Sequence, residues 1–354
     1  MKKFKSPPGM KGWNFNKEEV EVARRKGKLL MMYADMSSKC DLNCLYCQTR
    51  SGKPLPGELN LEERKNLVDQ SKALGCKTIH IAGQGEPTID PLFWEHLEYI
   101  YQKGIIPVIF THGMHIDKDT AERLYDMDVS VIIKVHSFNE KNQDWMAGVK
   151  GYAKKRNEGI KNLFEAGFNA ETPTRMGMDV VITQQNLAEI PDMFRWARKN
   201  NVFPEIKTLL SAHRGASKFV REKMQVTPEE VRKLHYDILK IDQEEFGYTW
   251  IPSPPYIAWH CDFYYYHIYV NIFGDAMPCV GFVLSEPLGN IREKSLKELW
   301  NHPLMLKVRN IDKHLKGVCA ECKNDCYGCP CRRLLRTGDI NRVFESRGCW
   351  EDNM

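Results

Sequence analysis

The chain has 354 residues, which at roughly 150 residues per domain predicts one large and one small domain and excludes a lone small module. Its 51 basic and 46 acidic side chains give a net charge of +5 with both signs mixed, so no nucleic-acid-coating surface is expected. Hydrophobic residues make up 42% of the chain, and no window reaches the about 18 apolar residues of a membrane span. No signal peptide follows the basic N-terminus, so a soluble, cytoplasmic protein without a membrane or nucleic-acid partner is expected.

Residues 1–28 are expected to form an N-terminal extension. Short apolar runs then alternate with amphipathic stretches over residues 29–225, the pattern of βα units around a parallel sheet. Helix N-caps are expected at Asn60, Asp90 and Asp117. The six expected strands cover residues 29–34, 78–82, 107–110, 129–135, 177–182 and 205–209.

A charged amphipathic stretch and three prolines follow, and they predict a helical linker over residues 226–255. The remainder, residues 256–354, is rich in cysteine, with a hairpin expected around Gly274. In a parallel α/β fold the loops after the strands meet at one mouth, where working groups collect.

Twelve cysteines in a chain of this length point to metal ligation rather than to a disulfide scaffold. Cys40, Cys44 and Cys47 fall in the loop after the first expected strand. Zinc sites and electron-transfer [4Fe–4S] clusters normally take four protein ligands, so three cysteines leave one iron open to another ligand. An open iron argues against a non-catalytic electron carrier. The isolated Cys76 is expected to be a buried core thiol.

The Cys-x3-Cys-x2-Cys spacing, with Tyr46 before the last cysteine and a Gly-Glu-Pro turn ending at Pro87, resembles the radical S-adenosylmethionine (SAM) enzymes. The resemblance implies a partial (β/α)6 TIM-like barrel in residues 29–225. It implies that the three cysteines hold a [4Fe–4S] cluster whose open iron binds SAM. It further implies reductive cleavage of SAM to a 5′-deoxyadenosyl radical, which abstracts hydrogen from a substrate.

The same resemblance suggests contacts to SAM. Glycines let a backbone approach a ligand closely, and the carboxylate of Glu86 can accept from the methionine ammonium. Gln84 stands where the family usually has glycine, and the alternative for Ser137 is ordinary loop polarity. The expected SAM-binding residues are Tyr46, Gly83, Gln84, Gly85, Glu86, Pro87 and Ser137.

Residues 256–354 resemble the SPASM domain, a small cysteine-rich module that holds auxiliary iron–sulfur clusters. The resemblance implies two auxiliary [4Fe–4S] clusters. Zinc remains an alternative, because Cys-x2-Cys pairs do not distinguish the metals. The outer cluster would take Cys319, Cys322, Cys326 and Cys349. The inner cluster would take Cys261 and Cys279 with either Cys329 or Cys331, a choice that the tight spacing leaves open.

The substrate is expected to be a small polar metabolite of the sugar, cyclitol, aminoglycoside or nucleoside type. Peptide-modifying members often carry a leader-binding domain where this chain has residues 1–28, and Val280 follows Cys279 where sulfatase maturases have a carboxylate. The expected activity is that of a dehydrogenase or epimerase, and the expected reductant is a flavodoxin or ferredoxin. The alternative is a maturase of a peptide or protein side chain. Candidate catalytic residues are Arg214, whose guanidinium can bind a carboxylate or phosphate, and Tyr265.

Overall fold

The computed structural model describes residues 4–252, 256–258, 261–282 and 286–315. Within them, ten strands form one sheet in the order β10-β9-β8-β1-β2-β3-β4-β5-β6-β7. The strands are β1 (Met31–Ala34), β2 (Thr78–Ile81), β3 (Ile106–Thr111), β4 (Ser130–Lys134), β5 (Met176–Ile182), β6 (Phe203–Thr208), β7 (Tyr256–Ile257), β8 (His267–Val270), β9 (Asp275–Met277) and β10 (Gly289–Asn290). Strands β1 to β6 are parallel neighbours, as the alternating sequence pattern predicts.

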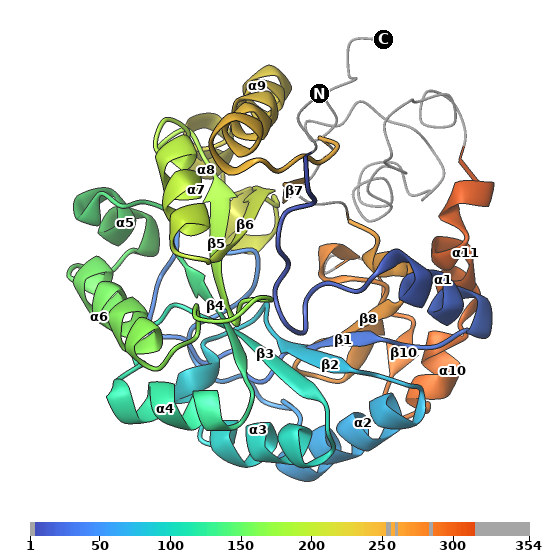
Figure 1. Ribbon diagram of the computed structural model, residues 1–354. Helices are drawn as coiled ribbons and strands as arrows, with labels where there is room; N and C mark the ends of the chain where they lie inside the picture. The colour runs from blue at the N-terminus through green and yellow to red at the C-terminus, as the bar shows by residue number, and fades with distance from the viewer. Residues whose placement is uncertain (1–3, 253–255, 259–260, 283–285, 316–354) are drawn as a thin grey trace.

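Figure 1 shows this sheet curved into a partial barrel, with helices on its outer face. The expected α/β class and partial TIM-like barrel are confirmed. In the part of the chain described above, no helix is both long and apolar enough to cross a membrane. The helices are α1 (Lys17–Lys26), α2 (Leu61–Ala73), α3 (Phe93–Gln102), α4 (Lys118–Asp126), α5 (Glu140–Ala147), α6 (Tyr152–Glu165), α7 (Ile190–Lys199), α8 (Lys218–Lys223), α9 (Pro228–Ile241), α10 (Leu296–Trp300) and α11 (Pro303–Arg309).

The helix caps follow local side-chain chemistry. Asn60 caps α2 in a capping box, and Asp117 caps α4, as predicted. The expectation for Asp90 was wrong by two residues, because α3 begins at Phe93 with Leu92 as its cap. The Asp90 carboxylate instead accepts a hydrogen bond from the Leu92 amide and pairs with the buried Arg64 at 2.8 Å.

The carboxyl-terminal hairpin belongs to the barrel sheet. Strands β8 and β9 pair antiparallel around Gly274 (φ +87°), as predicted, and β8 also runs parallel to β1. This second pairing was not predicted, since it joins segments more than 200 residues apart. Because β9 runs back along β8, the segment after Met277 lies toward the amino end of β1, and the loop after β1 lies at the carboxyl end.

The N-terminal segment closes the opposite end of the barrel. Trp13 is 1% exposed and stacks on the ring of His80, with centroids 5.0 Å apart. The backbone at Gly12 passes beside Thr78 and Ile106, the first residues of β2 and β3. This segment therefore belongs to the barrel core.

Candidate active site

A cavity of about 240 Å3 extends from the loops at the carboxyl ends of the parallel strands into the interior of the barrel. Cys40, Cys44 and Cys47 line it from the loop after β1. Cys261 and Cys279 line the same cavity from the carboxyl-terminal region. The two cysteine groups that lie far apart in the sequence therefore face one space.

The three thiols of the β1 loop suit an iron–sulfur cluster. None of the three is in a disulfide. Burial raises the pKa of Cys40 to about 12 and that of Cys44 to about 11. Burial also disfavours ionisation of Cys47, but hydrogen bonds with Thr49 lower its pKa overall. Thiols in such surroundings become thiolates when a bound metal compensates their charge, so this donor set fits a cluster.

The backbone of the cysteine loop is held in place by Arg214. Its Nε donates to the carbonyl of Cys44 at 3.0 Å, and its Nη1 donates to the carbonyl of Ser51 at 3.1 Å. The neighbouring amide of Gly215 donates to the carbonyl of Cys47 at 3.0 Å. Arg214 lines the cavity, and its guanidinium braces this loop.

The Glu86 carboxylate is buried among donors of its neighbouring loops. Its Oε1 accepts from the hydroxyls of Thr111 at 2.6 Å and Thr88 at 2.7 Å. Its Oε2 accepts from the backbone amide of His112 at 2.8 Å. The carboxylate therefore ties the loop after β2 to the loop after β3, while still lining the cavity.

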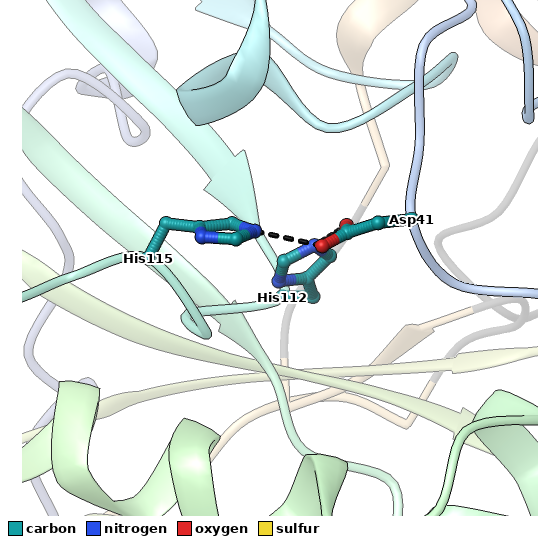
Figure 2. A group of neighbouring side chains, drawn as sticks. All are labelled: Asp41, His112 and His115. Atoms are coloured by element: carbon teal, nitrogen blue, oxygen red, sulfur yellow. Dashed lines mark hydrogen bonds and ion pairs between the residues drawn. The ribbon is translucent and has the colours of Figure 1, made fainter.

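A second link joins the cysteine loop to the loop after β3. Figure 2 shows Asp41 between two imidazoles, with His112 Nε2 2.7 Å from one carboxylate oxygen and His115 Nε2 2.8 Å from the other. Burial acts to raise the pKa of Asp41, but the hydrogen bonds from both histidines lower it well below its usual range. The contact fixes Asp41, which directly follows the first cysteine.

The turn after β2 approaches its neighbours so closely that two positions exclude a side chain. A Cβ at Gly85 (φ +79°) would lie 2.0 Å from the carbonyl oxygen of Ser37. A Cβ at Gly83 (φ +102°) would lie 2.5 Å from a carboxylate oxygen of Asp35. Glycine is required at both positions, and each exposes backbone to the cavity.

Asp35 gives this part of the site a pH dependence. Burial raises its pKa to about 8 from an ordinary value of 3.8, and a 2.6 Å hydrogen bond from the Tyr269 hydroxyl opposes that rise. The folded protein thus holds a proton that the unfolded chain loses at lower pH. The stabilising contribution is complete below the unfolded pKa and disappears as the pH rises through the folded value.

We therefore expect wild type to lose stability relative to Asp35→Asn as the pH increases from about 4 to about 8. Chemical denaturation of both proteins across this range measures the difference. The exposed Asp126→Asn serves as the control and should show no such trend. A constant difference between wild type and Asp35→Asn would contradict the expectation.

The predicted site residues divide into three groups. Tyr46, Gly83, Gly85, Glu86 and Arg214 line the cavity. The described lining does not include Gln84, Pro87, Ser137 or Tyr265. The six remaining predicted ligands lie outside the described residues, namely Cys319, Cys322, Cys326, Cys329, Cys331 and Cys349.

Two of the predicted residues have other partners. The Ser137 hydroxyl donates to the Glu189 carboxylate at 2.7 Å, so it helps to hold the start of α5 against α7. The Tyr265 ring lies under the guanidinium of Arg24, 4.2 Å from it. Its neighbour Tyr264 lines the cavity instead.

Sequence reasoning missed four polar residues that line the cavity from inside the barrel. They are Lys134, His136, Glu205 and Lys207. The sequence feature that could have identified the lysines and the glutamate is a charged residue within an otherwise apolar strand, since charged residues are rarely buried without a partner. In β6, Glu205 and Lys207 are two residues apart and therefore share the inner face.

Relatives share this architecture over most of the chain. The AdoMet-dependent heme synthase of Methanosarcina barkeri is 24% identical over 343 residues, covering 86% of this chain and 92% of the relative. The mycofactocin maturase MftC of Mycolicibacterium smegmatis is 29% identical, covering 57% of this chain and 49% of the relative. The structure of Streptococcus suis SuiB bound to precursor peptide SuiA superposes with a TM-score of 0.69 at 18% identity, covering 94% of this chain and 79% of SuiB.

These relatives overturn the expected substrate class. They include maturases, a bacteriocin biosynthesis protein from Bacillus subtilis, and a heme synthase. The expectation of a small sugar-like metabolite, and of a dehydrogenase or epimerase acting on it, was therefore wrong. The length of residues 1–28 therefore did not discriminate between the substrate classes.

The family comparison agrees with the two groups of cysteines. Residues 35–197 match the radical SAM superfamily. Residues 261–323 match the SPASM iron–sulfur cluster-binding domain. The first match implies a SAM-binding [4Fe–4S] cluster, and the second implies auxiliary clusters. The chain is therefore a radical SAM enzyme with a carboxyl-terminal SPASM domain.

Proposed function

We propose that this enzyme is a maturase that modifies a side chain of a peptide. One structural observation carries the proposal: the β1-loop cysteines and the SPASM cysteines Cys261 and Cys279 line a single cavity. A substrate group in that cavity is reached from both metal-binding regions. The likeness to SuiB, which was solved with a precursor peptide, supports a peptide as the substrate, as does the similarity to the maturase MftC.

Within this proposal Cys40, Cys44 and Cys47 hold the SAM-binding cluster. When bound, the cluster supplies the electron that cleaves SAM to methionine and a 5′-deoxyadenosyl radical, which abstracts hydrogen from the substrate. Arg214 holds the loop carbonyls around the three thiols. Gly83 and Gly85 let the backbone approach SAM closely.

The SPASM cysteines have a separate role in the proposal. Cys261 and Cys279 contribute to the inner auxiliary cluster, opposite the β1 loop across the cavity. The aromatic residues Phe263 and Tyr264, which follow Cys261 closely in the sequence, also line the cavity. A flavodoxin or ferredoxin is the proposed reductant, and the chain divides functionally into the barrel and the region after residue 255.

The test uses anaerobically reconstituted holoenzyme with SAM and a strong reductant. The substrates are synthetic short peptides, each deuterated at one type of side chain. We expect deuterium to appear in 5′-deoxyadenosine and the mass of one peptide to change. Formation of 5′-deoxyadenosine without deuterium from any peptide would contradict the proposal.

A second candidate function is modification of a porphyrin side chain. It is favoured by the extent of the match to the heme synthase, which spans 86% of this chain. The same assay with iron-coproporphyrin III deuterated in its propionate groups tests this candidate. Deuterium transfer from the porphyrin, and not from the peptides, would replace the first candidate by the second.

A further inference from the structure

Four charged side chains, alternately basic and acidic, contact one another in a row inside the barrel. Lys134 Nζ pairs with one carboxylate oxygen of Asp179, and Lys207 Nζ lies 3.1 Å from the other. Lys207 Nζ also lies 2.9 Å from Glu205 Oε1. The carboxylate side chains are 0% and 2% exposed, whereas those of Lys134 and Lys207 are 33% and 23% exposed. The two lysines are therefore more exposed than their acidic partners, and both line the cavity, as does Glu205.

The two ammonium groups converge on one place. Lys134 Nζ is 4.9 Å from the centroid of the Phe110 ring, and Lys207 Nζ is 5.5 Å from the same centroid. Each ammonium has three donors. Among the described residues, Lys134 has one acidic partner and Lys207 has two, so three donors are left for a ligand.

His136 adds a further donor at this place. The amide of Val181 donates to its Nδ1 at 3.1 Å, so the hydrogen of the neutral ring is on Nε2. Burial lowers the pKa of His136 to about 3, which keeps the ring neutral. Its Nε2 is buried and has no hydrogen-bond partner among the described residues, although the side chain lines the cavity. A buried donor without an acceptor is destabilising, and a ligand oxygen would satisfy it.

We propose that a carboxylate of the substrate binds to Lys134 and Lys207 in this cavity. The inference rests on the proposed function. It adds that the substrate group bound at this site is a carboxylate. A carboxylate offers several acceptors to the ammonium donors, and hydrogen bonds between charged groups are stronger than neutral ones. A cationic group would be repelled by the same two ammonium groups.

The buried carboxylate Glu205 can compensate for the extra negative charge by becoming protonated. Burial raises the pKa of Glu205 to about 7, and the charged groups around it are Lys207, Asp179 and Lys134. Glu205 can therefore take up a proton near neutral pH when another anion approaches. With Glu205 neutral, the two lysines balance Asp179 and the incoming carboxylate.

The experiment measures binding to the reconstituted holoenzyme by calorimetry, without turnover, first in the absence of SAM and then with SAM at saturation. One probe pair is N-acetyl-Ala-Ala-Glu-Ala-Ala-amide and its Gln counterpart. The other pair is iron-coproporphyrin III and its tetramethyl ester. We expect the carboxylate member of one pair to bind about tenfold more tightly than its neutral counterpart. The pair that shows the preference distinguishes a peptide carboxylate from a porphyrin propionate.

Variants show whether the preference belongs to this site. Lys134→Met should remove it, and Lys134→Arg should retain most of it. Lys207→Met combined with Glu205→Gln tests the second lysine without leaving a buried carboxylate unpaired. Lys154→Met, at an exposed position on α6, is the matched control and should keep the preference.

Several results would contradict the proposal that Lys134 and Lys207 bind a substrate carboxylate. They are equal or undetectable binding within both pairs, a preference that survives Lys134→Met, and a preference that disappears when SAM is saturating. The last would mean that the lysines hold SAM. Failure of the proposed function is distinguishable from failure of this site. A probe preference without deuterium transfer from any peptide or porphyrin would support the carboxylate site and contradict the proposed reaction.

Discussion

Replacing Cys40, Cys44 and Cys47 together by Ala should remove about four irons per chain and reduce 5′-deoxyadenosine formation below detection. The three thiols line the cavity and are the proposed ligands of the SAM-binding cluster. Loss of one cluster leaves the iron of the SPASM domain in place, so about eight irons should remain if two auxiliary clusters are present. Iron and sulfide analysis with Mössbauer spectra measures both quantities.

Cys76→Ala is the matched control for this experiment. Its thiol is 2% exposed and donates to the carbonyl of Thr78 at 3.1 Å, in the core and away from the cavity. The control should keep all of its iron and its SAM cleavage. Full iron content in the triple variant would refute the proposed ligand set. Zinc in place of the remaining iron would show that the SPASM domain is structural.

Gly85→Ala is expected to disrupt the cysteine loop, although it adds a single methyl group. Its Cβ would lie 2.0 Å from the carbonyl oxygen of Ser37 and 2.9 Å from that of Lys39. Both carbonyls belong to the backbone just before Cys40, so the loop must shift. We expect a loss of about 2–4 kcal/mol in unfolding free energy, and SAM binding about tenfold weaker or worse.

Gly57→Ala is the control that distinguishes the effect of the close contact at Gly85 from the effect of left-handed backbone strain. Gly57 has φ +85°, close to the +79° of Gly85, but a Cβ there would have no atom within 4 Å. Both variants carry the strain of a left-handed backbone, which costs about 1–2 kcal/mol. Denaturation and SAM titration of the two proteins should therefore differ strongly. Similar values would show that the close approach at Gly85 has no consequence.

The barrel strands were predictable because their signal is local. Buried parallel strands are continuous apolar runs, and β4 and β5 coincide with their predicted ranges to within one residue at each end. The Asn60 cap was readable for the same reason, since a capping box needs only residues three apart. The Asp90 cap failed because the same carboxylate also pairs with Arg64, a contact that depends on tertiary packing.

The sequence by itself indicated the cofactor chemistry, through the resemblance of its Cys-x3-Cys-x2-Cys spacing to the radical SAM enzymes, because such a motif lies within eight consecutive residues. It did not determine the substrate class, which depends on what the whole cavity presents. Only the tertiary structure brought β8 beside β1 and placed the SPASM cysteines in the same cavity. Only the tertiary structure also brought Lys134 of β4 near Lys207 of β6, since both strands pair with β5, which lies between them. Short-range spacing fixes ligands and caps, whereas the charges that meet inside a barrel are set by pairing between distant segments.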